Sequence, residues 1–335
     1  MTTMEAWQCK TFSGAVEKNL YLATSVPKPI PTDTEVIVEV FSTSVNPIDY
    51  KILELGLIPR LALKAPVTPG LDISGRVVEV GSKVNTFKTG DIVYGACNGV
   101  FEHGAMAQYV QASQDMIALA PQGARHEDLA AVATVGMTTL QAIRPYVKAS
   151  DKVFINGGSG GTGTLAIQIA KQLGCHVTTS CSTANVELCK SLGADEVLDY
   201  KKADIVEQLN ARETRFEAII DNVGNPSNLY RAGGRYLQPK GTFVQVGLGM
   251  DLAALRQFMG NKFLPGFLGG GRGKYVFAIT KPNKADFELL GSWFETGKIR
   301  AVIDSEYKFS AAPEAFSRLK TGRSRGKVVV RVQEA

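Results

Sequence analysis

The sequence lacks the features that mark membrane, secreted and nucleic-acid-binding proteins. No apolar run reaches the ~20 residues needed to cross a bilayer. The N-terminal MTTMEAWQCKTF has no basic segment followed by an apolar core, so we expect no targeting peptide. Lys and Arg are scattered among Asp and Glu at a net charge of +5, which argues against binding of nucleic acid or membranes. We therefore expect a cytoplasmic enzyme that acts on a small molecule.

Paired cysteines and clustered histidines are also missing. The five cysteines are odd in number and none falls in a C-x-x-C pair, which argues against a disulfide framework and favours a reducing compartment. The three histidines, His103, His126 and His176, are isolated from one another. A zinc site needs three or four N, S or O ligands that can converge, so we predict no metal.

The chain of 335 residues is long enough for two domains. Up to about residue 125, short apolar runs alternate with Gly and Pro, which predicts strands of four to seven residues. After His126 the pattern becomes strand, glycine turn and helix, repeated, as βαβ units with a parallel sheet require. Strands return at 274–280, 299–309 and 326–332, and we expect them to rejoin the first domain. We predict an α/β protein in which a Rossmann-type doubly wound domain, residues 126–267, is inserted in a β-rich domain formed by 1–125 and 268–335.

A glycine-rich turn after the predicted strand 152–156 indicates a dinucleotide site. Gly158, Gly160 and Gly163 satisfy G-x-G-x-x-G immediately before the predicted helix 161–173. Glycine permits a tight turn and bare backbone against a pyrophosphate, which the helix N-terminus then faces. An ordinary glycine-rich turn is the alternative. The other residues predicted to bind cofactor in this turn are Ser159, Gly161 and Thr162.

The end of the next strand predicts NADPH rather than NADH. An acidic residue there would bind the ribose 2′-hydroxyl of NAD and repel a 2′-phosphate. The segment VTTSCST offers Ser180 and Ser182 instead. Lys190 and Tyr200 are close enough in sequence to reach the same phosphate, although a solvated helix lysine is an equal alternative for Lys190.

Two further strands end at the edge of the sheet where dinucleotides lie. The first is followed by the segment IIDNVG and the second by a Val-Gly pair. Backbone groups there are candidates for binding the nicotinamide carboxamide. The predicted residues are Asn222, Val223, Gly224, Val246 and Gly247.

Five segments in order along the chain resemble the medium-chain dehydrogenase/reductase superfamily. They are SVNPIDYK (44–51), residues 69–95, the glycine turn, KSLGADEVLDY (190–200) and IIDNVG (219–224). The match is to the zinc-independent quinone oxidoreductase branch, which includes ζ-crystallin and the reticulon-4-interacting reductases. Zinc members carry a Cys where this chain has Ser44 to Asn46, and Gly-His-Glu where it has Gly70, Leu71 and Asp72.

The resemblance implies a GroES-like first domain and a set of site residues. Asn46 and Tyr50 are expected to border the nicotinamide and the substrate as catalytic residues, with a turn residue before Pro as the alternative for Asn46. Thr138 is expected to open a helix under the nicotinamide, where a plain helix N-cap is the competing role. Lys327 is expected to approach the cofactor. Residues 274–280 resemble the edge that pairs across dimers, so a homodimer is expected by analogy.

The resemblance also implies hydride transfer from NADPH to a quinone or an α,β-unsaturated carbonyl, because such acceptors are already polarised by conjugation. One alternative is an enoyl-thioester reductase that acts beside a polyketide or fatty-acid synthase. Arg256, Lys262, Arg272 and Lys274 would then form a basic rim for acyl-carrier protein, although scattered surface charge is the usual explanation. Another alternative is an NADPH-binding protein of this fold without redox turnover, since fold does not fix function.

Overall fold

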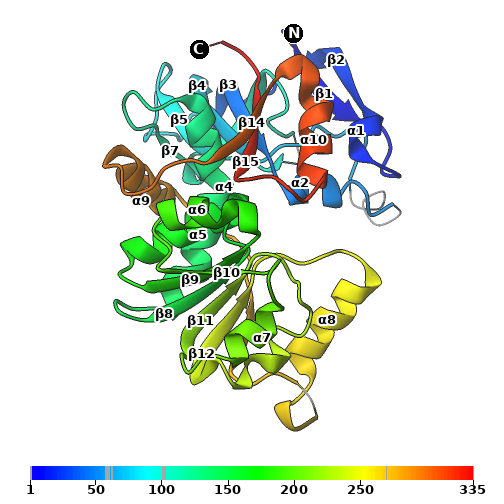
Figure 1. Cartoon of the computed structure of the whole chain (residues 1–335). Helices are drawn as coiled ribbons and strands as arrows, with labels where there is room; N and C mark the ends of the chain where they lie inside the picture. Colours follow the sequence, from blue (N-terminus) through cyan, green and yellow to red (C-terminus); the bar gives the residue numbers. More distant parts are fainter. Residues whose placement is uncertain (1, 57–60, 62, 100–102, 269, 335) are drawn as a thin grey trace. The chain divides into compact units, whose positions relative to one another are not determined.

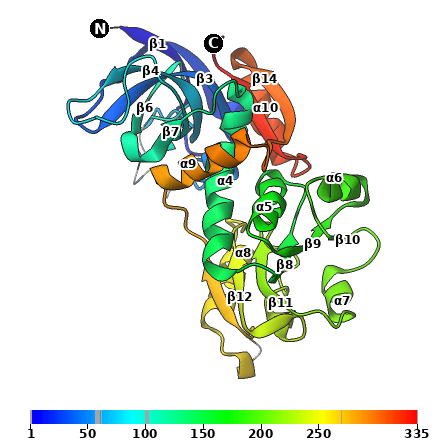
Figure 2. The same cartoon turned by 90° about the vertical axis from the view of Figure 1, so that its left-hand side faces the viewer.

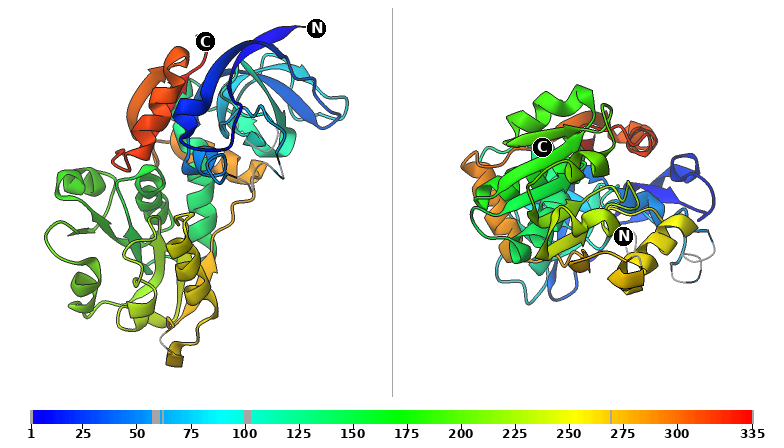
Figure 3. Two further views of the ribbon diagram at one scale, coloured as in Figure 1. Left: turned by 90° about the vertical axis from the view of Figure 1, so that its right-hand side faces the viewer. Right: turned by 60° about the horizontal axis from the view of Figure 1, so that its bottom comes forward.

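The chain forms two compact units in the computed structural model. Unit 1 contains residues 1–137 and 282–335, and unit 2 contains residues 138–281. The structure describes residues 2–56, 61, 63–99, 103–268 and 270–334. Both ends of the chain belong to unit 1 (Figures 1 and 3), so unit 2 is an insertion, as the sequence predicts.

Unit 2 is built on a six-stranded sheet in which every pairing is parallel. Its order is β10-β9-β8-β11-β12-β13. The strands are β8 (Lys152–Asn156), β9 (His176–Cys181), β10 (Glu196–Asp199), β11 (Phe216–Asp221), β12 (Leu237–Gln245) and β13 (Lys274–Phe277). Counted from β8 this is the 3-2-1-4-5-6 order of a Rossmann fold, in which the strand order reverses between β8 and β11. The prediction of a doubly wound sheet is confirmed, and the carboxyl ends of β8 and β11 are the expected place for a ligand.

Four helices pack against this sheet (Figure 2). They are α5 (Gly161–Gln172), α6 (Val186–Ser191), α7 (Ile205–Asn210) and α8 (Leu252–Phe263). Helix α5 lies against β8 and β9, α6 and α7 lie against β10, and α8 lies beside β13. Leu165, Ala166 and Ile169 of α5 are buried, as is an aromatic cluster that includes Phe154 and Phe243. These apolar contacts fix the sheet on which the glycine turn is mounted.

Unit 1 contains a seven-stranded sheet and a separate hairpin. The sheet has the order β14-β15-β3-β4-β5-β7, with β6 also paired to β3, and the hairpin is β1-β2. The strands are β1 (Thr3–Cys9), β2 (Leu20–Pro27), β3 (Glu35–Val45), β4 (Asp72–Val80), β5 (Ile92–Ala96), β6 (Tyr109–Ser113), β7 (Ile117–Leu119), β14 (Ile303–Lys308) and β15 (Lys327–Arg331). Strand β3 exceeds the expected four to seven residues because its first part pairs with β6 and its last part with β15, while β4 spans much of its length.

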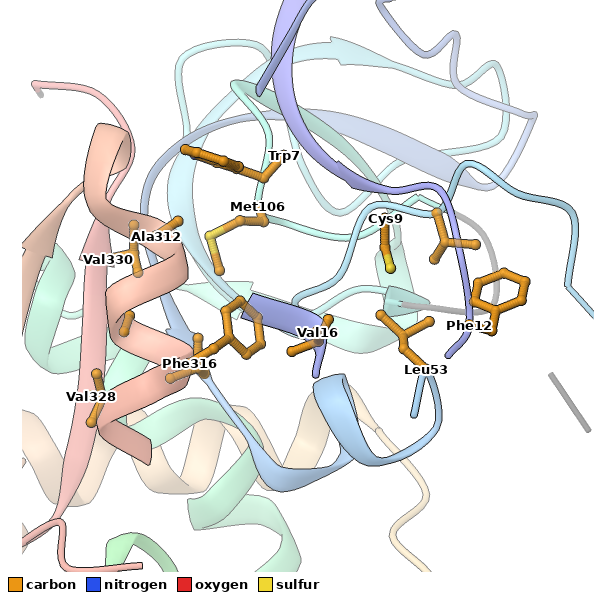
Figure 4. Packing of buried hydrophobic residues seen from close by; sticks show 13 residues of the cluster. Trp7, Cys9, Phe12, Val16, Leu53, Met106, Ala312, Phe316, Val328 and Val330 are labelled. Carbon is orange, nitrogen blue, oxygen red and sulfur yellow. The ribbon is translucent and has the colours of Figure 1, made fainter. Parts of the chain in front are cut away.

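The C-terminal elements complete the core of unit 1 (Figure 4). In the described part of this unit the helices are α1 (Val16–Asn19), α2 (Pro47–Lys51), α4 (His126–Ile143, which continues into unit 2), α9 (Lys284–Glu295) and α10 (Ala312–Lys320). Phe316 of α10 and Val328 of β15 are buried in one cluster with Trp7 of β1. The two ends of the sequence therefore share one hydrophobic core.

Two expectations about the domain limits are corrected. Residues 274–280 do not rejoin the β-rich domain, because β13 extends the sheet of unit 2 in parallel with β12. Helix α4 does begin at His126, but its first half belongs to unit 1, where the Thr134 amide donates to Asp72 Oδ1 (2.7 Å). The units divide inside α4 rather than at its start, because packing and not local sequence character sets the limit.

Candidate functional site

The glycine turn joins β8 to α5 and excludes side chains at two of its three motif glycines. A Cβ on Gly158 would lie 2.1 Å from Thr179 Oγ1, and a Cβ on Gly163 would lie 2.0 Å from Gly157 O. Gly157 has a φ of +82°, in the left-handed region that favours glycine. The turn therefore brings the start of α5 close to the sheet, as a dinucleotide fold requires.

Gly160 differs from these glycines because it borders open space. A Cβ there would meet only Gly157 O, at 3.9 Å. Gly160 is the N-cap of α5 and caps the helix with no side chain, so the first amides of this 12-residue helix have no side-chain acceptor at the cap. Bare backbone and unsatisfied N–H groups at a helix N-terminus fit a diphosphate. The predicted residues Ser159, Gly161 and Thr162 flank this space and are partly exposed.

A buried hydrogen-bond network holds the turn from below. Ser180 Oγ accepts from the Gly157 amide (2.9 Å) and donates to Asn156 Oδ1 (2.7 Å). Asn156 Nδ2 donates to Asp221 Oδ1 (2.8 Å), and Gln245 Nε2 donates to Asp221 Oδ2 (3.0 Å). Asn156, Asp221 and Gln245 end β8, β11 and β12, and Ser180 is the last residue but one of β9. Burial raises the pKa of Asp221, against the effect of its amide donors.

Sequence reasoning missed three members of this network. We gave no role to Asn156 or Gln245, or to Asp221 within the segment IIDNVG. A pattern was nevertheless present, since each is the polar last residue of an apolar strand, in KVFIN, FEAIID and GTFVQ. Polar residues that close neighbouring parallel strands meet at one edge of the sheet, and buried ones need partners.

The residues predicted to bind a 2′-phosphate lie in different environments. Ser180 is fully buried and its hydroxyl is engaged in the network above. Ser182 is partly exposed and accepts from Asn185 Nδ2 (3.2 Å), which also reaches Ser159 Oγ of the glycine turn (3.1 Å). Lys190 is exposed and pairs with Glu187 (3.0 Å). Tyr200, just after β10, is about half exposed. Of the two serines, only Ser182 presents accessible surface near the turn.

Asn222 stands out among the residues that follow β11. Its Oδ1 and Nδ2 are both buried, and neither has a hydrogen-bond partner in the described part of the chain. A buried amide without partners is costly, which sets the Asn222 side chain apart from the hydrogen-bonded backbone around it. Gly247 allows close approach, since a Cβ there would lie 1.9 Å from Asn222 O. The exposed Val223 side chain lies against Gly157.

Other amides predicted to bind cofactor at this edge are already used within the protein. The N–H groups of Val246 and Gly247 donate to Asp221 O at 2.8 and 3.0 Å. Those of Val223 and Gly224 donate to Asp221 Oδ1, each at 3.0 Å. The backbone here is therefore held by Asp221, whereas the side-chain amide of Asn222 and the Oε1 atom of Gln245 have no partner among the described residues.

Thr138 does not open a helix, which corrects both of the roles considered for it. It lies inside α4, where its hydroxyl is 2.8 Å from that of Thr280. It also lines a cavity of about 200 Å³ beside the edge strand β13, together with Tyr146 and Phe277. Thr138 lies inside the helix because α4 starts twelve residues earlier, at His126.

Asn46 is buried in unit 1 between β3 and α2, and Tyr50 follows it on α2. The Asn46 amide N–H donates to Asp49 Oδ2 (2.7 Å). Burial raises the pKa of the Asp49 carboxyl to about 7, and the charge of Asp72 adds to this effect. Tyr50 is half-buried against the core cluster of Figure 4, and burial followed by the charge of Glu54 raises its pKa. The phenol therefore keeps its proton at neutral pH.

The Asn46 side chain joins a second buried network. Its Nδ2 donates to Asp72 Oδ2 (2.7 Å), and its Oδ1 accepts from Lys327 Nζ (2.5 Å). Lys327 Nζ also donates to Asp72 Oδ2 and to Val45 O, each at 3.2 Å. The hydroxyl of Ser44 hydrogen-bonds Asp72 Oδ2 as well. The structure thus brings together Asn46 and Lys327, which the sequence placed far apart, and adds Asp72 to them.

Within residues 2–56, 61, 63–99, 103–268 and 270–334, no group of three or more His, Cys, Asp or Glu could hold a metal ion. In the same residues no helix has the length and apolar character needed to span a bilayer.

Comparison with known proteins gives consistent matches over the chain. A family model described as alcohol dehydrogenase GroES-like domain matches residues 32–122, and one described as zinc-binding dehydrogenase matches residues 192–330. The trans-enoyl reductase pgmF of Aspergillus terreus is 41% identical, over 99% of this chain and 97% of that protein. The human mitochondrial NAD(P)H oxidoreductase RTN4IP1 is 31% identical, over 99% of this chain and 90% of that protein. The quinone oxidoreductase structure from Coxiella burnetii superposes with a TM-score of 0.85 at 30% identity, covering 98% of this chain and 99% of that one.

Proposed function

Since the chain belongs to the medium-chain dehydrogenase/reductase superfamily, in its zinc-independent quinone oxidoreductase-like branch, we propose that it reduces a quinone or an α,β-unsaturated carbonyl with NADPH. The observation that carries the proposal is the open space over Gly160 at the start of α5, on the same sheet edge as the unpartnered amide of Asn222. When bound, the nicotinamide cofactor supplies a hydride to the electrophilic carbon of the acceptor.

We assign the hydrogen-bond donors for the acceptor oxygen to Asn46 and Tyr50. Negative charge grows on that oxygen during reduction, and donors fixed in advance stabilise it without reorganisation. The Asn46 Nδ2 group carries two hydrogens and gives one to Asp72, so we assign the second to the acceptor oxygen. Tyr50 remains protonated at neutral pH and is the second donor. Conjugated acceptors need no stronger acid, because holding two reactants in line contributes effective molarities of ~10⁵ M or more.

A panel of acceptors tests the proposal. We expect NADPH oxidation with 9,10-phenanthrenequinone and with 2-alkenals, and slower oxidation with crotonyl-CoA. Turnover of the thioester alone would contradict the preferred substrate class. Tight NADPH binding with no oxidation by any acceptor would contradict redox function and identify an NADPH-binding protein that uses the fold for another purpose.

Ser182→Asp should weaken the preference for NADPH over NADH about tenfold or more. A carboxylate at the end of β9 repels a 2′-phosphate and accepts from a ribose 2′-hydroxyl instead. Dissociation constants for both dinucleotides, measured by calorimetry, give the ratio directly. The control is Ser191→Asp, an exposed helix position on α6. An unchanged ratio in the Ser182 variant would place the 2′-end of the cofactor elsewhere.

A second candidate function is reduction of enoyl thioesters carried by another protein. Two observations favour it: the 41% identity to a trans-enoyl reductase, and an apolar stripe along α8. Leu252, Leu255, Met259 and Phe263 are all exposed, and their spacing places them on one helix face. Arg256 and Lys262 on the helix are exposed, and so are Arg272 and Lys274 in the segment after it. An apolar stripe with cations and no acidic residue within the helix suits an acidic acyl-carrier protein.

The double variant Arg256→Glu/Lys262→Glu separates the two candidates. If the substrate arrives on a carrier protein, we expect the kcat/KM for carrier-bound enoyl thioester to fall about tenfold. The kcat/KM for crotonyl-CoA should stay unchanged, because the chemistry is not touched. Lys148→Glu/Lys152→Glu, with exposed lysines before and at the start of β8, is the matched control. Equal loss on both substrates, or no loss on either, would argue against docking at α8.

A further inference from the structure

We propose that Lys327 is a positioning residue whose buried ammonium orients the side-chain amide of Asn46. The inference deepens the proposed function, on which it rests. The side chain of Lys327 is 5% exposed and that of Asp72 is 0% exposed, so both charges lie away from water. A buried lysine side chain is uncommon unless its charge is paired, and here the partners are specific.

Each N–H group of the Lys327 ammonium has a hydrogen-bond acceptor. The ammonium has three N–H groups and no acceptor atom of its own, and three oxygens lie within hydrogen-bond distance: Val45 O, Asn46 Oδ1 and Asp72 Oδ2. No hydrogen is left for a phosphate of the cofactor while this arrangement holds. Lys327 therefore acts through Asn46, in contrast to the cofactor contact that the sequence predicts for it.

The same contacts determine which way the Asn46 amide faces. An ammonium can only donate, so the atom of Asn46 beside it must be the carbonyl oxygen Oδ1. Nδ2 then faces Asp72 Oδ2, to which it donates at 2.7 Å. If the amide were flipped, two donors would meet at Lys327 and two acceptors at Asp72. The Lys327–Asp72 pair thus selects one of the two amide orientations, and with it the place of the free Nδ2 hydrogen.

Asp49 adds a second constraint on the same residue. Its buried carboxylate accepts from the backbone amide of Asn46, while Lys327 and Asp72 engage the side chain. The backbone N–H and the side-chain amide of Asn46 therefore have different hydrogen-bond partners. Loss of Lys327 should free the side chain and leave the backbone in place.

Lys327→Met tests the proposal, with Lys308→Met as the matched control on the neighbouring strand β14, where the lysine is exposed. The double variant Lys327→Met/Asp72→Asn removes both charges, and so keeps the test valid if the single variant folds poorly. The first readout is the pair of side-chain amide signals of Asn46 in a ¹⁵N-labelled protein. We expect slow hydrogen exchange of these amide protons in the native protein and in Lys308→Met, and fast exchange in both Lys327 variants.

Binding and turnover complete the test. The Kd for NADPH should change less than about threefold, whereas kcat should fall about 10²-fold, the loss expected when a reacting group is misplaced. Adding Asn46→Ala to Lys327→Met should cause no further loss beyond Asn46→Ala alone. A tenfold rise in the Kd for NADPH, or unchanged exchange of the Asn46 amide, would overturn the proposal. The exchange readout needs no substrate, so it decides the proposal even if no acceptor is turned over.

Discussion

Gly160→Ala should change the stability of the protein by no more than about 1 kcal/mol and yet lower its affinity for NADPH about tenfold or more. The backbone at Gly160, with φ −79° and ψ 174°, suits alanine, and the added methyl meets no atom closer than 3.9 Å. The gain of ~0.4–1 kcal/mol from a less flexible unfolded chain is offset by the preference of an N-cap for glycine over alanine. The methyl nevertheless occupies the space in which we place the diphosphate. Thermal unfolding and calorimetric titration with NADPH measure the two effects separately.

Gly163→Ala is the matched control for that prediction. Its Cβ would lie 2.0 Å from Gly157 O, so the turn itself must shift and both stability and affinity should fall. The two variants add the same methyl group three residues apart, and only the surroundings differ. If Gly160→Ala bound NADPH with native affinity, the cofactor would not lie against this part of the turn.

Asp221→Ala should destabilise unit 2 by about 3–5 kcal/mol, the range for breaking a buried, fully bonded charge group. Four donors would lose their acceptor: Asn156 Nδ2, Gln245 Nε2 and the amides of Val223 and Gly224. These groups are buried or held by the strand ends, so water cannot easily replace the carboxylate. Urea unfolding followed by circular dichroism gives the change in free energy of unfolding.

Asp204→Ala provides the contrast on the surface of the same unit. Asp204 is the exposed N-cap of α7 and accepts from the amides of Val206 and Glu207. Loss of a helix cap typically costs about 1 kcal/mol. Equal destabilisation by the two substitutions would mean that the network at the carboxyl ends of the strands is not a structural centre of unit 2.

The Rossmann unit was predictable because its signals are local. The strand, turn and helix around Gly158, Gly160 and Gly163 follow one another within about twenty residues. The geometry of this one turn explains why each position is glycine. The residues 274–280 carried an equally clear strand pattern, but nothing local indicates which sheet a strand joins. That choice depends on the free edge of β12, which only the assembled sheet presents.

The same distinction between local and non-local signals applies to the site residues. Asn46 and the glycine turn came from motifs, whereas the hydrogen bonds that hold them could not be read from those motifs, because their partners lie on other strands. Ser180 illustrates what local sequence cannot predict. The sequence suggests that its hydroxyl binds a phosphate, but in the fold this hydroxyl hydrogen-bonds to Gly157 and Asn156. Lys327 is 281 residues from Asn46, and no spacing rule connects two strands that pair only in the folded sheet.

Strand β3 links the placement of Asn46 to two separate packing environments. Val36, Val38 and Val40 of this strand are buried in one apolar cluster, and Val45 is buried in the other, one residue before Asn46. A cavity opened in either cluster would shift the backbone of β3. Because the strand is continuous, the shift would reach Asn46. Random mutagenesis that selects for altered turnover should therefore recover valine substitutions from the far end of this strand, remote from any atom of the substrate.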